Sequence, residues 1–70
     1  MQNLPLANNL RVLRRRSGNT RQELANELKI HRSVYACYEN GYVVPPIDCL
    51  LRLCQRYGLT LDELVRDELC

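Results

Sequence analysis

The chain has 70 residues and a formal net charge of +2, and 46% of its residues are hydrophobic, a share typical of a globular domain. This length predicts a single domain, 1–70, whose modest core must consist of Leu and Tyr because Trp and Phe are absent. No stretch approaches the roughly 20 apolar residues of a membrane span, and the N-terminus lacks a signal-peptide pattern. We therefore expect a cytoplasmic protein with no membrane partner.

The charge is unevenly distributed along the chain. Residues 1–42 hold seven Arg or Lys against three Glu, whereas residues 43–70 hold three Arg against five acidic residues. An anionic partner for the first half would explain this asymmetry, but a charge cluster is also a common feature of an ordinary solvated surface. Charge alone leaves both interpretations open.

The first predicted helix begins at Pro5 and ends at Gly18, two residue types that favour these positions. Leu6, Leu10 and Leu13 recur at i, i+4 and i+7, which places them on one inner stripe. The four arginines of this helix lie off that stripe. Arginines near the C-terminal end of a helix are favoured by its dipole, which gives them a structural role of their own.

Residues 20–40 predict a pair of short helices joined by a tight turn. Thr20 and Glu23 have the spacing of a capping box, which starts the first helix, and Asn40-Gly41 ends the second. Lys29 falls in the turn between them. The side chains expected to face inward are Leu24, Ala25, Leu28, Ile30, Tyr35 and Tyr38.

Residues 42–46 are predicted to form an extended loop because Pro45 and Pro46 disfavour helical backbone before them. A fourth helix begins at residue 47, and a second capping-box spacing, from Thr60 to Glu63, starts a fifth. The fourth helix is expected to bury Ile47, Leu50, Leu53, Cys54 and Tyr57, and the fifth to carry its apolar side on Leu61, Leu64, Val65 and Leu69. The predicted fold class is all-α, with five helices.

No metal site, cofactor site or catalytic site is expected. The four cysteines are Cys37, Cys49, Cys54 and Cys70, and the closest two are five residues apart within a predicted helix. Zinc-ligand pairs usually stand two to four residues apart around a turn. No nucleophile, base and orienting group come together in the sequence, so we expect neither an enzyme nor a small-molecule ligand.

Several of these features occur together in a recognisable order. They are Arg14, Gly18, Thr20, the pair Leu24-Ala25, the YENG run 38–41, Pro45 and the GLTLDEL run 58–64. Together they resemble the Cro/repressor-type (XRE-type) helix-turn-helix family. The resemblance implies a compact, five-helix, lambda-repressor-like domain that binds double-stranded DNA, with residues 31–39 as the recognition helix in the major groove.

Carried over position by position, the resemblance implies base contacts from Arg32, Ser33 and Cys37. An arginine near the start of this helix can donate two hydrogen bonds to O6 and N7 of guanine. Ser33 can donate or accept and so discriminates weakly. Cys37 stands where the family usually carries a longer polar or basic side chain, so a base contact and a residue that touches little remain open alternatives.

The resemblance implies phosphate contacts from Arg21 and Asn40, with Tyr42 as a further candidate. Arg21 replaces the glutamine usual in the family, which should keep the phosphate contact and make it more dependent on salt. His31 is expected either to contact phosphate or to pack against or cap the recognition helix.

The resemblance also implies a structural ion pair between Arg14 and Glu39, which ties the recognition helix to the first helix. One departure from the family supports an alternative function. Basic residues commonly follow the YENG glycine, but here the run is Tyr42-Val43-Val44. The alternative is a protein-interaction module, antitoxin-like or anti-repressor-like, that keeps the fold with weak or no specific DNA binding.

A dimer would let a domain of this size read two half-sites about one helical turn apart. The fifth helix and the 42–46 loop offer more apolar surface than the core needs. We therefore expect a weak homodimer through these two segments. The residues expected at the contact are Leu61, Val65 and Leu69 with Val43 and Val44.

Overall fold

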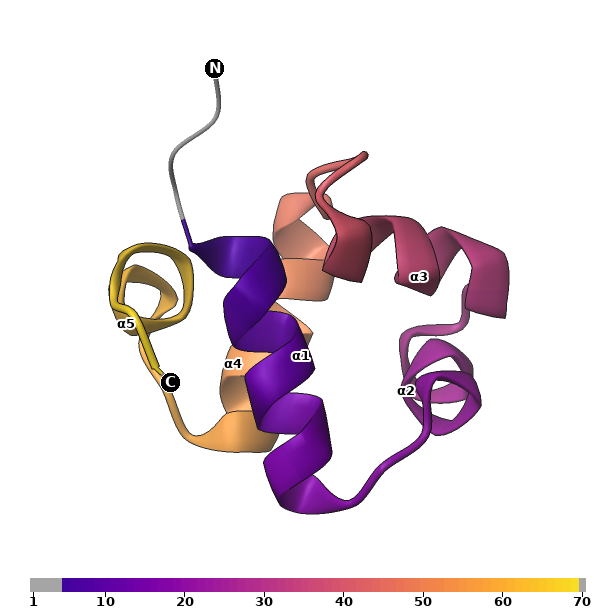
Figure 1. The fold of residues 1–70 in the computed structure, drawn as a ribbon, viewed down its shortest axis with the longest axis horizontal. Helices are drawn as coiled ribbons and strands as arrows, with labels where there is room; N and C mark the ends of the chain where they lie inside the picture. Colours follow the sequence, from indigo (N-terminus) through magenta and orange to yellow (C-terminus); the bar gives the residue numbers. More distant parts are fainter. Residues whose placement is uncertain (1–4, 70) are drawn as a thin grey trace.

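The computed structural model describes residues 5–69, and these residues form five α-helices and no strand (Figure 1). Their bounds are α1 Leu6–Ser17, α2 Arg21–Leu28, α3 Arg32–Asn40, α4 Ile47–Tyr57 and α5 Leu61–Arg66. The predicted all-helical fold is confirmed. None of the helices in the described residues is long and apolar enough to cross a membrane.

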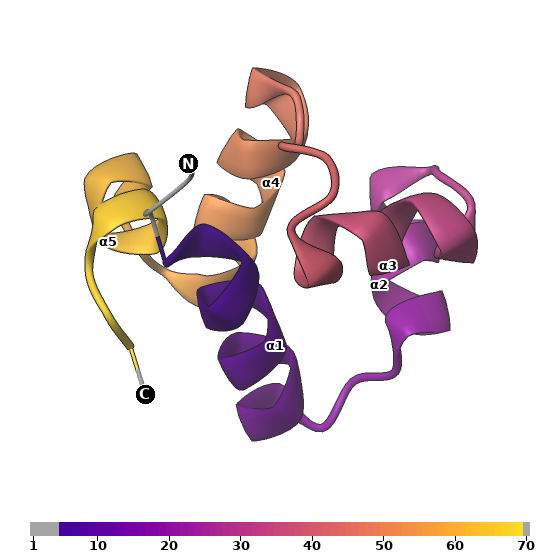
Figure 2. The ribbon, with the colours of Figure 1, turned by 45° about the horizontal axis from the view of Figure 1, so that its top comes forward.

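Helix α1 is central to the arrangement. Figures 1 and 2 show α5 on one side of it and α2 and α3 on the other, and α1 packs against both α3 and α5. The core between the helices consists mainly of leucine and tyrosine, as the composition predicts. Its buried apolar members are Leu6, Leu10, Leu24, Ala25, Leu28, Tyr35, Tyr38, Cys49, Leu50, Leu53, Cys54 and Leu64.

Both predicted capping boxes are present. The Thr20 hydroxyl accepts a hydrogen bond from the Glu23 backbone N–H at 3.1 Å, and the Glu23 carboxylate accepts one from the Thr20 N–H at 2.8 Å. Thr60 and Glu63 repeat this pair of bonds at the start of α5. The bond from the Thr20 backbone lowers the pKa of Glu23, so the carboxylate stays ionised beside the helix start.

The turn between α2 and α3 is tight because Lys29 ends α2 in the left-handed conformation, with φ of 61°. The Ile30 backbone N–H reaches back to the Ala25 carbonyl at 3.0 Å, the bond that closes a Schellman motif. A lysine in this conformation costs on the order of 1 kcal/mol relative to glycine. The benefit is that only residues 29–31 separate the two helices.

Two details of the predicted core are wrong. Ile47 is 58% exposed, and Cys49 is buried in its place. The buried stripe of α4 is centred on Leu50 and Leu53, and at 100° per residue Ile47 lies roughly 90° from that centre. In addition, α5 ends at Arg66, so Leu69 is not part of its apolar side.

Hydrogen bonds that the sequence did not predict fix the last described residues against α1. Asn9 is fully buried, and its Nδ2 donates to the carbonyl oxygens of Leu64 at 2.8 Å and Asp67 at 2.6 Å. Its Oδ1 accepts from the Leu69 backbone N–H at 3.1 Å, and Arg16 donates to the Leu69 carbonyl at 2.6 Å. The segment after α5 is therefore attached to α1 by hydrogen bonds.

Candidate nucleic-acid interface

Helix α3 divides its residues between a buried face and an outward face. Tyr35 and Tyr38 are buried, and their rings meet edge to face with centroids 6.3 Å apart. Arg32 and Ser33 are exposed, and Cys37 is half-buried. Positions 32, 33 and 37 fall on one face of a helix, so these three side chains share the surface opposite the tyrosines. This is the surface on which the family resemblance predicts the base contacts.

His31 directly precedes α3 and takes the N-cap position. Its side chain makes no capping hydrogen bond, and the residue is exposed. The capping alternative for His31 is therefore wrong. Because the residue is exposed, the structure does not support the packing alternative either. A phosphate contact by His31 stays a prediction.

The end of α3 is closed by Gly41, which adopts φ of 78°. The Tyr42 backbone N–H donates to the Cys37 carbonyl at 3.0 Å, which completes the cap. A Cβ on Gly41 would lie 3.8 Å from the Cβ of Ala7, so α3 ends close to the first turn of α1. Asn40 and Tyr42, two predicted phosphate contacts, are both exposed at this end.

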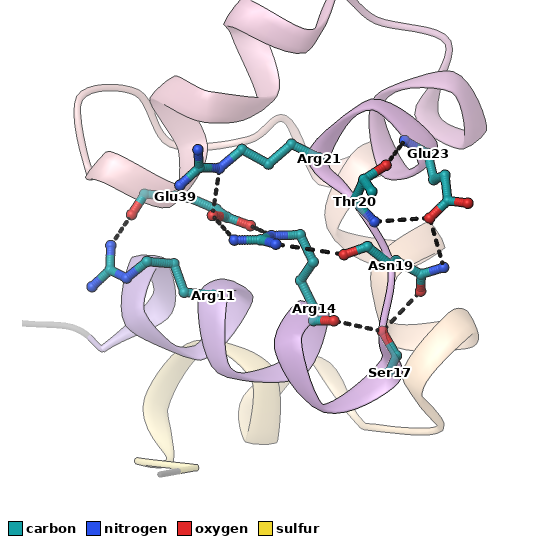
Figure 3. Close-up of polar contacts among 8 residues, drawn as sticks. All are labelled: Arg11, Arg14, Ser17, Asn19, Thr20, Arg21, Glu23 and Glu39. Atoms are coloured by element: carbon teal, nitrogen blue, oxygen red, sulfur yellow. Dashed lines mark hydrogen bonds and ion pairs between the residues drawn. The ribbon is translucent and has the colours of Figure 1, made fainter.

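A buried ionic cluster connects α1, α2 and α3 (Figure 3). Glu39 is fully buried on α3, and Arg14 from α1 contacts both its carboxylate oxygens, with Nε 2.7 Å from Oε2 and Nη2 3.2 Å from Oε1. Arg21, at the start of α2, places its Nε 3.1 Å from Oε1. Arg14 and Glu39 are thus in contact, and Arg21 belongs to the same cluster, which the sequence analysis did not foresee.

Two opposing effects set the ionisation of Glu39. Burial raises the pKa of this carboxyl, but hydrogen bonds from the guanidinium groups of Arg14 and Arg21 help to outweigh burial and leave the pKa below its ordinary value. Glu39 is therefore a carboxylate at neutral pH. Burial and the nearby Glu39 raise the pKa of Tyr35, which keeps its hydroxyl neutral.

Arg11 adds a second connection between α1 and α3. It donates to the backbone carbonyl of Glu39, and its Nη2 lies 3.2 Å from Asn8 Oδ1. Carbonyl oxygens in the last turn of a helix have no intrahelical partner, so an arginine that binds one satisfies it and stabilises the helix end. Helix α3 is thus held in place by the ionic contacts of Glu39 near its C-terminal end and by the buried Tyr35 and Tyr38 along its length.

The surface beyond α3 is apolar rather than basic. Large exposed hydrophobic side chains run from the loop into the first turns of α4: Tyr42, Val43, Val44, Ile47 and Leu51. Val34 of α3 is also partly exposed. The 42–46 loop therefore has no charged side chain, and a phosphate contact in this part of the surface would have to use backbone groups or the Tyr42 hydroxyl.

The cysteines within residues 5–69 are free thiols, and Cys70 lies outside the described residues. Burial raises the pKa of Cys49 and Cys54, which keeps both as unreactive thiols. In the described part of the chain, no three His, Cys, Asp or Glu residues gather as metal ligands.

Comparison with known proteins identifies the fold. Residues 5–67 match the helix-turn-helix domain family. A crystal structure of a transcriptional regulator from Listeria innocua superposes with a TM-score of 0.87 and 31% sequence identity, over 91% of this chain and 60% of that one. This chain therefore spans less than two thirds of that regulator, and no curated protein matches it significantly. The chain belongs to the helix-turn-helix domain family.

Proposed function

We propose that the protein is a transcriptional regulator that binds double-stranded DNA sequence-specifically, with α3 in the major groove. The observation that carries this proposal is the outward face of α3, where Arg32 and Ser33 are exposed on a helix that Glu39 ties to both α1 and α2. A base-reading side chain discriminates only if its helix is held in a fixed orientation. The family membership and the regulator from Listeria innocua support the same function.

The proposal divides the contacts into two kinds. Arg32, Ser33 and Cys37 would face base edges, and Arg32 carries most of the discrimination because a guanidinium can bind both O6 and N7 of guanine. Phosphate contacts would come from Arg21, His31, Asn40 and Tyr42. These positions lie at the starts of α2 and α3 and at the end of α3, so they flank the base-reading face along the chain.

Replacing the two arginines separately tests this division. We expect Arg32→Ala to cost about 1–3 kcal/mol of binding free energy on the preferred sequence and to relax preference at one base pair. We expect Arg21→Ala to weaken binding to all sequences about equally. The slope of the logarithm of the binding constant against the logarithm of the salt concentration should become shallower by about one. The preferred duplex is first selected from a random pool, and isotherms are then measured at several salt concentrations for it and for one variant site.

Two results would contradict the proposal. A uniform loss of affinity in Arg32→Ala, with base preference retained, would mean that Arg32 contacts the DNA backbone and that α3 docks differently. Binding by the parent protein that does not depend on salt, or no binding to any duplex, would favour the alternative of a protein-interaction module. The exposed Tyr42, Val43 and Val44 are the feature that this alternative would use.

We further propose that two copies bind one operator as a weak homodimer through α5 and the 42–46 loop. Val43 and Val44 are exposed in the loop. On α5, Leu61 and Val65 are half-buried and line a shallow hollow with Asp62 and Arg66. Leu69 lies beyond α5 and would contribute from the segment that Asn9 holds.

Sedimentation of the protein with its selected duplex measures the stoichiometry. We expect two chains per operator at saturation, with the half-sites about one helical turn apart. Val44→Asp should weaken the binding of the second chain to the operator, because the aspartate introduces a charge into the apolar contact between the two chains. A single chain per operator at saturation would rule out the dimer.

A further inference from the structure

Arg21 and Glu39 lie 18 residues apart in the sequence, yet their side chains meet at 3.1 Å. We propose that Glu39 is a positioning residue for DNA binding, which orients the Arg21 guanidinium so that its outer N–H groups face a phosphate. The inference rests on the proposed function, and it goes further by assigning a role in the phosphate contact to a buried carboxylate that never touches DNA.

The first support is the balance of charge in the cluster. One carboxylate faces two guanidinium groups, so one positive charge remains uncompensated (Figure 3). Arg14 uses two nitrogens on the two oxygens of Glu39, and only 14% of its side chain is exposed, whereas 42% of the Arg21 side chain is exposed. The excess charge is therefore presented to solvent by Arg21 and not by Arg14.

The second support is which nitrogen of Arg21 is occupied. Its contact with Glu39 uses Nε, and no partner for either Nη group is found within residues 5–69. A guanidinium is planar and rigid, so a bond at Nε fixes the direction of the remaining four N–H groups. The side chain is thereby ordered before DNA arrives, and binding loses less conformational freedom.

The third support is where Glu39 lies. It belongs to α3, the helix that we propose reads the bases, and its carboxylate reaches Arg21 at the first residue of α2. The direction of the phosphate contact is then set by the position of the recognition helix. A lysine would reproduce this arrangement poorly, because its ammonium is a compact charge on a flexible stem and lacks the planar fork that keeps one N–H on Glu39 while directing the others outward.

The experiment compares charge-conserving and charge-removing variants of Arg21 on the selected duplex. We expect Arg21→Ala to lose about tenfold in affinity, and Arg21→Lys to lose nearly as much, within about twofold of Arg21→Ala, despite its retained charge. The matched control is Arg15→Lys, an exposed arginine of α1 outside the cluster, which should bind like the parent. Circular dichroism confirms that each variant is folded.

A second measurement tests the orientation in the absence of DNA. In the ¹⁵N spectrum of the free protein, we expect the Arg21 Nε–H to give a distinct, slowly exchanging signal that Glu39→Gln shifts or broadens. If the parent binds DNA but Arg21→Lys binds as tightly and with the same salt dependence, Arg21 acts only as a charge and the positioning role of Glu39 is wrong. If the parent binds no duplex, the proposed function itself fails.

Discussion

Arg14→Met is expected to lower the free energy of unfolding by about 3–5 kcal/mol, because it leaves a buried carboxylate without its main partner. Glu39 has no exposed surface, and its carboxylate accepts two hydrogen bonds from the Arg14 guanidinium. Methionine retains much of the side-chain volume, so the loss arises chiefly from the charge. The whole stability of a small domain is of the order of 5 kcal/mol, so the variant should be partly unfolded at room temperature.

The same substitution should reverse the pH dependence of stability. In the parent, the lowered pKa of Glu39 gives a stabilising contribution that is present above the pKa of the unfolded state and lost as pH falls through the folded-state pKa. Without Arg14, burial dominates and the pKa of Glu39 should rise above its ordinary value. The contribution of Glu39 to the stability of Arg14→Met is then fully present below the unfolded-state pKa. It is lost as pH rises through the raised folded-state pKa.

Urea unfolding at about pH 4, 5.5 and 7 measures the free energy of unfolding and its pH dependence over the range in which carboxyl groups titrate. The matched control is Arg15→Met, which removes an exposed arginine from the same helix and should change stability by less than about 1 kcal/mol. Parallel pH profiles for the parent and Arg14→Met would show that the ion pair does not determine the ionisation of Glu39.

Asn9→Asp is expected to have an effect of similar size, about 3–5 kcal/mol, with almost no change in side-chain shape. The amide nitrogen of Asn9 donates to the carbonyls of Leu64 and Asp67, and a carboxylate would instead place its negative charge against both oxygens. Asn9→Ala is the matched comparison. It removes the hydrogen bonds without introducing a charge, so its cost should be about 1–3 kcal/mol.

Chemical denaturation of the two variants beside the parent decides this prediction. The introduced carboxyl should be protonated more easily in the folded state than in the unfolded state, so Asn9→Asp should recover part of its stability as pH falls toward about 4. If Asn9→Asp is no less stable than Asn9→Ala at neutral pH, the charge is reaching solvent and the segment after α5 has come away from α1.

Features that depend on neighbouring residues were predictable from the sequence. Each capping box involves residues three apart, and the starts of α2 and α5 are where Thr20 and Thr60 indicate. The register of α4 was predicted less well. Ile47 belongs to the right helix but lies at the edge of its apolar stripe, and an apolar pattern alone does not show which edge the core covers.

Contacts between distant residues were predictable only through the family resemblance. That resemblance pointed to Arg14 with Glu39, but Arg21 departs from the family pattern, so nothing in the sequence indicated that it would share the same carboxylate. Asn9 lies 55 and 58 residues from the two carbonyls that it binds. An asparagine within a helix has no local signal for such partners, because its burial depends on how α1 and α5 pack.

The attachment of the last described residues to α1 has a practical consequence for labelling. Figures 1 and 2 both show the last described residues beside α1 and α5, with α2 and α3 on the far side of α1. Since Asn9 and Arg16 fix the backbone of Leu69, a fluorophore or surface linker joined beyond it would start from a defined point. An immobilised protein would then present its helix-turn-helix to solution, facing away from the support.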